Sequence, residues 1–294
     1  MEFFTDLIRY PFLQYALAAS VLSSVASGVV GSLIVVRRST YIAGAISHSV
    51  LGGLGAARFF QVVYGVSWFT PMVGATIAAI CAACIISWAT AYAKERVDSV
   101  LSIIWALGMA IGIIFIMKTP GYSQDLMSYL FGNILMVTPT DLFFMGALNL
   151  IIIALTALFF NQILSVCFHE EASLVRGIPV AAVTFVILII SALTVVLLTQ
   201  IVGIVLVIAL LSIPAATASR LTNRLFSMMI TAAFLSLLFT TSGLAVSYRL
   251  ELPTGATVIL IAGICYLQVV LLNTNICKRN LTKCSKAVSQ LKNR

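Results

Sequence analysis

The chain has 294 residues, of which 61% are hydrophobic and 9% are charged, and its formal net charge is +8. Soluble domains carry about 25% charged residues, so this composition excludes a water-soluble globular protein of this size. The basic excess does not indicate nucleic-acid binding, because the basic residues lie between apolar runs of membrane-spanning length.

These apolar runs predict an all-α, polytopic transmembrane bundle. About 20 apolar residues cross a bilayer core of about 30 Å, and in lipid the backbone must satisfy its own hydrogen bonds, so each run is a helix. Ten-residue segments of alternating polarity, as in a β-barrel, are not seen in the sequence. The predicted spans, in chain order, are residues 13–36, 41–64, 71–93, 100–117, 140–165, 180–199, 201–218, 226–248 and 256–273.

The number of spans is left at eight or nine, because only Thr199 and Gln200 separate two of them. A broken or re-entrant helix in this stretch would have to be buried in protein or line a cavity. Residues 1–294 are expected to form a single transmembrane domain with a basic tail at about 274–294.

The basic residues predict the orientation of the chain in the membrane. If the breaks after the first, third, fifth and seventh spans lie on the same side as the tail, that side holds 13 of the 17 Lys and Arg residues. Such asymmetry marks the cytoplasmic side. With nine spans, the N-terminus then lies outside.

The longest predicted external break is residues 119–141, in which Leu126–Met136 is expected to form a short helix at the interface. Three acids are predicted on the external side, Asp125, Asp141 and Glu251. Attraction of cations or a docking partner is one interpretation of these acids, and ordinary loop charges and helix caps are the other.

His48 is the clearest candidate for chemistry, because an ionisable residue at membrane depth is costly and usually functional. It lies about 12 Å into the second predicted span at 1.5 Å per residue, among Gly and Ser residues that allow another backbone to approach. Imidazole is a common ligand of transition metals. The alternative is a histidine that only packs against a neighbouring helix.

Two other polar positions are given structural interpretations. His169 adjoins Glu170 and Glu171 and is expected in a solvated loop. Thr240, Thr241 and Ser242 lie inside a span, where hydroxyls usually bond back to the backbone.

Six motifs in order resemble those of the membrane subunits of bacterial zinc/manganese/iron ABC importers, over about Phe12 to Leu272. They are VVRRSTYIAGAISHSVLGGLG, RVDSVLSIIWALGMAIGIIF, DLMSYLFGNIL, HEEASLVRGIPV, VGIVLVIALLSIPAATASRL and LELPTG. The resemblance implies a permease that imports a divalent transition metal across the inner membrane by alternating access, and no permanently bound cofactor.

The resemblance also implies partners: two cytoplasmic ATPase subunits, a second permease that is the same chain or a paralogue, and an external solute-binding protein. The sequence has no GxxxxGK[ST] phosphate-binding loop, so this chain is predicted not to be an enzyme and ATP hydrolysis belongs to another chain. The segment that docks on the ATPase is implied to include Pro214, Ala215, Ala216, Ala218, Arg220 and Arg224. Pro214 is expected to end or kink its span.

One position departs from the family pattern. Members usually have Asp four residues before the second-helix His, and here that residue is Gly44. Residues at i and i+4 share a helix face, so the missing carboxylate removes one ligand and one negative charge beside His48. Two alternative functions stay open: a permease for an organic iron chelate, and a membrane subunit that does not transport.

Overall fold

The computed structural model describes residues 2–91, 93, 95–120, 132, 134–204 and 206–272, and in that part its regular elements are all helices. The predicted all-α bundle is therefore confirmed, with a helix at the place of each predicted span. The helices are α1 (Glu2–Arg9), α2 (Pro11–Val36), α3 (Thr40–Tyr64), α4 (Pro71–Ala91), α5 (Val97–Lys118), the 3-10 turn η1 (Ile134–Met136), α7 (Pro139–Leu158), α8 (Phe160–Phe168), α9 (Glu170–Val175), α10 (Val180–Val202), α11 (Val207–Leu221), α12 (Leu225–Leu250) and a last helix, Thr254–Leu272.

Eight of these helices are long enough to cross a membrane. Seven have both the length and the hydropathy, namely α2, α4, α5, α7, α10, α12 and the last helix. The 25-residue α3 has the length but is richer in Gly and Ser and contains His48 and Arg58. The 15 residues of α11 extend only about 22 Å, less than the bilayer core, so α11 begins partway through it.

The junction of α10 and α11 lies further along the chain than predicted. α10 continues through Thr199. The Thr199 hydroxyl donates to the Val196 carbonyl at 2.6 Å, so this polar side chain is satisfied within the helix. The helix instead ends at Gly203, whose φ of 79° lies in the region that favours glycine. Ile204, which follows, is fully buried. This irregular backbone is thus covered by protein, as it must be at membrane depth.

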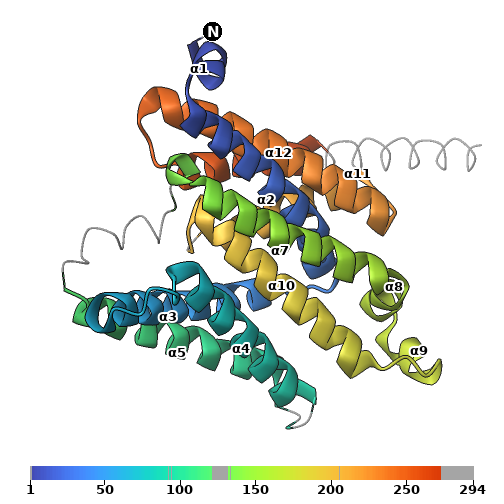
Figure 1. Cartoon of the computed structure of the whole chain (residues 1–294). Coiled ribbons are helices and arrows are strands. Elements are labelled where there is room, and N and C mark those ends of the chain that lie inside the picture. The colour runs from blue at the N-terminus through green and yellow to red at the C-terminus, as the bar shows by residue number, and fades with distance from the viewer. Residues whose placement is uncertain are drawn as a thin grey trace, which may run out of the picture.

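The bundle has two parts (Figure 1). In the larger part, α2 is central and packs along α7, α10, α11 and α12. In the smaller part, α3 lies between α4 and α5. The two parts meet where α10 packs along α4 and where α10 and α11 contact α3. Close approach in the larger part depends on small residues, since a Cβ added at Gly28 would lie 2.5 Å from Ala233 of α12.

The ends of the helices support the predicted sidedness. One cavity of about 100 Å³ is lined by the end of α2, the start of α3, the end of α4, and the starts of α5 and α10, so these termini share one end of the bundle. Arg37 donates to Thr184 there at 3.4 Å. Ala215 and Ala218 of α11 pack against Val35 and Val36, so Arg220 lies at this end too. We call it the basic end; the basic tail lies outside the described residues.

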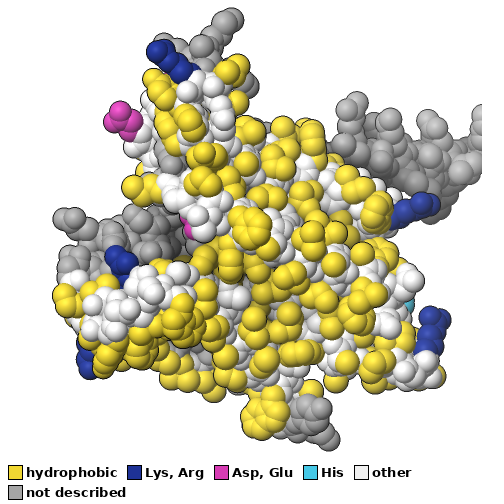
Figure 2. All heavy atoms as spheres, in the orientation of Figure 1, with side chains coloured by type: hydrophobic (Ala, Val, Ile, Leu, Met, Phe, Trp, Pro, Cys, Tyr) yellow, Lys and Arg dark blue, Asp and Glu magenta, His cyan; other side chains and the backbone are white. Residues whose placement is uncertain are grey.

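The surface of the bundle suits lipid. Figure 2 shows hydrophobic side chains over most of the visible face, with Lys and Arg at its margins. On α7, the exposed residues include Phe143, Leu150 and Leu158. In water such a patch would be a liability, whereas in a bilayer it is the expected exterior.

Candidate functional site

The smaller part of the bundle is built on contacts between glycine backbones. A Cβ added at Gly108 of α5 would lie 2.6 Å from Ser49 Cα and 2.9 Å from the His48 carbonyl oxygen. One turn further on, a Cβ at Gly55 of α3 would lie 2.8 Å from the Gly112 carbonyl oxygen. The two helices therefore pack with their backbones almost in contact, and this fixes the register of α3 against α5.

His48 lies in this contact zone, on the ninth residue of α3. Its imidazole stacks on the indole of Trp105, with ring centroids 4.4 Å apart and an interplanar angle of 22°. Its Nδ1 atom is buried and has no hydrogen-bond partner among the described residues. The adjacent Ser47 is different, because its hydroxyl donates to the Ala43 carbonyl at 2.7 Å. The structure thus presents one nitrogen with an unused lone pair or proton at membrane depth.

Gly44, one turn before His48, has no room for a side chain. A Cβ there would clash with the Trp105 ring, lying 3.0 Å from its Cη2 and closer still to its Cζ3. It would also lie 2.9 Å from Ile208 Cδ1 of α11. The space beside His48 that a carboxylate at position 44 would enter is therefore filled by the indole of Trp105.

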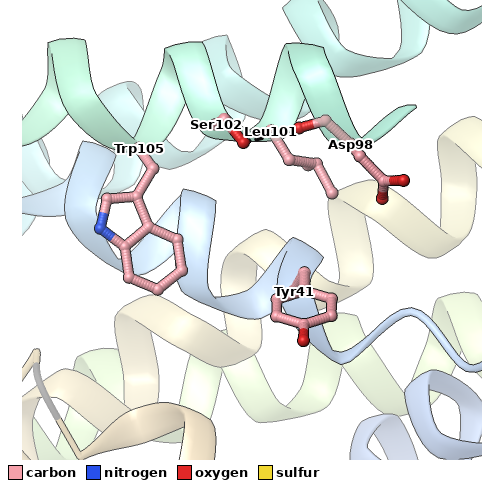
Figure 3. Close-up of a pocket in the computed structure, with 5 residues that line it drawn as sticks. All are labelled: Tyr41, Asp98, Leu101, Ser102 and Trp105. Carbon is pink, nitrogen blue, oxygen red and sulfur yellow. Dashed lines mark hydrogen bonds between the residues drawn. The ribbon is translucent and has the colours of Figure 1, made fainter. Parts of the chain in front are cut away.

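Toward the basic end, a pocket of about 550 Å³ opens beside α3 and α5, lined by Tyr41, Asp98, Leu101, Ser102 and Trp105. Figure 3 shows the side chains of Trp105 and Tyr41 entering the same space, with the Asp98 carboxylate at the opposite end from Trp105. The Ser102 hydroxyl donates to the Asp98 carbonyl at 2.8 Å. This pocket was not predicted. Its signal in the sequence is the spacing of Asp98, Ser102 and Trp105 at i, i+4 and i+7, which places them on one face of a helix.

The predicted docking residues separate into two sets. Pro214, Ala215 and Ala218 are buried within this chain, where Ala215 and Ala218 pack against Met228 and Ala232 of α12. Ala216 is half-buried, whereas Arg220 and Arg224 are exposed. Of the two effects expected of Pro214, ending the helix is wrong, since α11 continues to Leu221, and a kink stays a prediction. A buried proline removes one N–H from the helix, and neighbouring helices supply the packing that holds the rest.

The predicted external acids are found in capping positions where the structure describes them. Asp141 forms a capping box at the start of α7, in which its Oδ2 accepts from the Thr138 backbone N–H at 3.0 Å and from the Thr138 hydroxyl at 2.7 Å. Glu251 is the C-cap of α12, with φ 54°. Asp125 and most of the predicted interface helix lie outside the described residues. His169 is exposed at the junction of α8 and α9.

In the part of the chain that the structure describes, no three His, Cys, Asp or Glu side chains come together as a metal site. Among the described residues, His48 is therefore not part of a site with three such ligands. The site is an imidazole, an indole and a pocket with one carboxylate at its far end.

Comparisons with known proteins agree with this architecture. The ABC 3 transport family matches residues 9–273. A "probable metal transport system membrane protein" of Chlamydia muridarum is 37% identical over 87% of each chain. The "manganese transport system membrane protein MntC" of Halalkalibacterium halodurans is 34% identical over 89% of this chain and 87% of that one.

Two solved structures are also similar. PsaBC of Streptococcus pneumoniae, in complex with a Fab, superposes with a TM-score of 0.80 at 30% identity, over 91% of this chain and 94% of that one. An inward-facing ABC transporter described as metal-chelate type superposes with a TM-score of 0.68 at 15% identity, over 91% and 88%. At 15% identity, the second similarity shows only that the two chains share a fold.

Proposed function

Because the chain belongs to the ABC 3 transport family, we propose that it is the permease subunit of an ATP-driven importer that moves a divalent transition metal by alternating access. The metal is zinc, manganese or iron, and the membrane is the cytoplasmic (inner) membrane. Relatives named for metal and manganese transport match nearly the whole chain. In the structure, the observation that carries the proposal is the unpartnered Nδ1 of His48 at membrane depth.

The chemistry of His48 suits a transported ion. A neutral imidazole binds zinc and related ions well, and it avoids the large desolvation penalty of a buried carboxylate. A single ligand from one chain also favours release, which transport requires. Further ligands would come from a second permease subunit or from the water carried by the ion.

The partners follow from what this chain lacks. It has no phosphate-binding loop, so two separate ATPase subunits would supply the energy, and an external binding protein would deliver the metal. We propose that the ATPase docks on the exposed end of α11, where Arg220 and Arg224 offer charged contacts. The buried residues Pro214, Ala215 and Ala218 would then hold α11 on α12 instead of touching the ATPase.

Docking is tested with the double variant Arg220→Glu, Arg224→Glu in the assembled complex. Reversing two charges at an interface should lower metal-stimulated ATP hydrolysis by about tenfold or more. The matched control is Arg249→Glu, at the end of α12 away from the basic end, which should hydrolyse ATP as the unmodified protein does. If both variants lowered ATP hydrolysis equally, α11 would not be the docking element.

The proposed function itself is tested by uptake of radiolabelled zinc and manganese into vesicles that contain the permease, the ATPase and the binding protein. His48→Ala should reduce uptake by about tenfold or more, because loss of one zinc or manganese ligand weakens binding strongly. His169→Ala is the matched control, since it removes the only other histidine in the chain, which is exposed. Full uptake by His48→Ala would leave His48 as a packing residue.

An organic iron chelate as substrate is less well supported. The likeness to the metal-chelate transporter is one of fold at 15% identity, whereas two relatives above 30% identity are named for metal and manganese transport. The uptake assay separates the two, because a chelate permease would leave free zinc and manganese outside the vesicles.

A further inference from the structure

The pocket beside α3 and α5 ends at a single side chain. Trp105 lines the pocket at the end opposite the Asp98 carboxylate, and the same indole stacks on His48, with ring centroids 4.4 Å apart. Beyond that point the helices are too close for any passage, because Gly108 and Gly112 bring the two backbones together. Trp105 therefore lies between the candidate ligand and this pocket, at the boundary of a closely packed and an open region.

We propose that this pocket is the chamber through which the metal ion leaves toward the cytoplasm, and that the Trp105 indole is the gate between the chamber and His48. The inference rests on the proposed function and extends it to a named exit route. In this structure the gate is closed, because the ring covers His48. Apolar constrictions of this kind close a pathway to hydrated ions.

The geometry around Gly44 explains how such a gate is held and released. The indole packs over Gly44, so no side chain at that position interlocks with the ring, and the stacking of His48 is the contact that the ring would have to break. Ile208 of α11 packs against the same point, 2.9 Å from the position of a Cβ on Gly44. A shift of α11 of one or two ångströms, as occurs for helices at moving interfaces, would change the space available to the ring.

The contact of Ile208 with the Gly44–Trp105 region links the gate to the proposed ATPase subunits. Ile208 lies near the start of α11, and Arg220 and Arg224, the proposed docking residues, lie at and just beyond its end. A packed helix moves as a rigid element. Movement of the ATPase at one end of α11 would thus reach Trp105 at the other end, without any contact between the ATPase and the metal.

The chamber has the chemistry of a release site. Asp98 supplies one carboxylate, and Tyr41 and Ser102 supply hydroxyls, which are oxygen ligands suited to an ion that keeps part of its water. All three side chains are exposed on the surface of this chain. A single exposed carboxylate attracts a divalent ion but holds it weakly, as an exit requires.

The gate is tested first by leakage. In vesicles that contain the complete complex, Trp105→Ala should raise ATP-independent entry of manganese by about tenfold over the unmodified protein, because the constriction is removed. Trp105→Phe, which keeps a ring, should leak less than Trp105→Ala by about threefold or more. Trp88→Ala on the exposed face of α4 is the matched control and should show no more ATP-independent manganese entry than the unmodified protein. A purely structural role would lower the yield of complex and create no leak.

A second measurement leaves position 105 unchanged. The chain has three tryptophans, so Trp68→Phe with Trp88→Phe leaves Trp105 as the one tryptophan of this chain, and partner subunits without tryptophan keep the signal specific to it. Its quenching by manganese should differ by about twofold or more between the nucleotide-free and ATP-bound complexes, because the ring changes its exposure. Asp98→Asn should weaken that quenching by about two- to fivefold, whereas Glu170→Gln, elsewhere at the basic end, should not change it.

The outcomes separate the gate from the proposed function. If the unmodified complex accumulates no metal with ATP, the proposed function fails. If it accumulates metal, but Trp105→Ala is tight and Trp105 is quenched equally in both nucleotide states, the gate is wrong and the proposed function stands. Equal quenching in Asp98→Asn and the unmodified chain would show that the ion leaves by another route.

Discussion

The helices α3 and α12 are of almost equal length and both contain polar residues at membrane depth. They differ in whether these polar side chains find hydrogen-bond partners. In α12, the hydroxyls of Thr240, Thr241 and Ser242 donate to the carbonyls four residues earlier, at 2.9, 2.7 and 2.6 Å. In α3, Ser47 does the same, while Nδ1 of the next residue, His48, has no partner among the described residues.

The difference follows from side-chain geometry. A hydroxyl on Cβ reaches the carbonyl of the previous turn and is satisfied inside its own helix, whereas an imidazole ring projects away from the axis and needs a partner from elsewhere. Polar character at membrane depth is thus not sufficient to identify a site. The predicted structural role of the α12 hydroxyls is confirmed by these bonds, and the unsatisfied nitrogen is what distinguishes α3.

The largest effect is expected from breaking the contact that holds α3 in place. Gly108→Leu would force a side chain into the backbone of Ser49 and the carbonyl of His48. Overpacking of this kind costs about 3 kcal/mol, so the variant should lose most of its folded yield and melt at a lower temperature in detergent. Gly146→Leu on α7 is the control, because nothing lies within 4 Å of a Cβ there. Equal melting of the two variants would contradict the tight α3–α5 contact.

A smaller and more informative effect is expected at Gly44. Gly44→Asp alone should lower stability and uptake, because its side chain meets the Trp105 ring and Ile208. Gly44→Asp combined with Trp105→Ala removes the clash with the ring, leaves only the flexible end of Ile208 in contact, and places a carboxylate one turn from His48. Oxygen ligands suit manganese better than zinc. The double variant should therefore be more stable than Gly44→Asp and bind manganese more tightly, relative to zinc, than Trp105→Ala does.

Binding of each metal to the purified permease by calorimetry measures this shift, with Trp105→Ala alone as the control for the lost ring. An unchanged ratio of manganese to zinc affinity in the double variant would show that position 44 does not face the bound ion. Additive stabilities of the two single variants would show that Gly44 and Trp105 do not share space.

The sequence was sufficient for the helical bundle, and it singled out His48, whose role as a ligand stays a prediction. It was insufficient for what surrounds His48. Spans follow from runs of apolar residues, which the bilayer imposes locally on each helix. The break at Gly203 was misplaced because a threonine can satisfy its hydroxyl within a helix. The Trp105 ring over Gly44 depends on the register of two helices about 60 residues apart, which backbone contacts between glycines determine and which no local pattern records.

The smallest effect is expected in α12. Thr241→Val keeps the shape of the side chain and removes a hydroxyl that bonds to its own helix. The Leu237 carbonyl remains in the helical hydrogen-bond ladder, so the loss should be about 0.5–1 kcal/mol of stability. Metal uptake should stay at the level of the unmodified protein, in contrast to His48→Ala in the same vesicles. A loss of uptake in Thr241→Val at normal yield would place an α12 hydroxyl on the ion's route. The distinction between α3 and α12 would then fail, because a side chain that is satisfied within its helix would also be serving the ion.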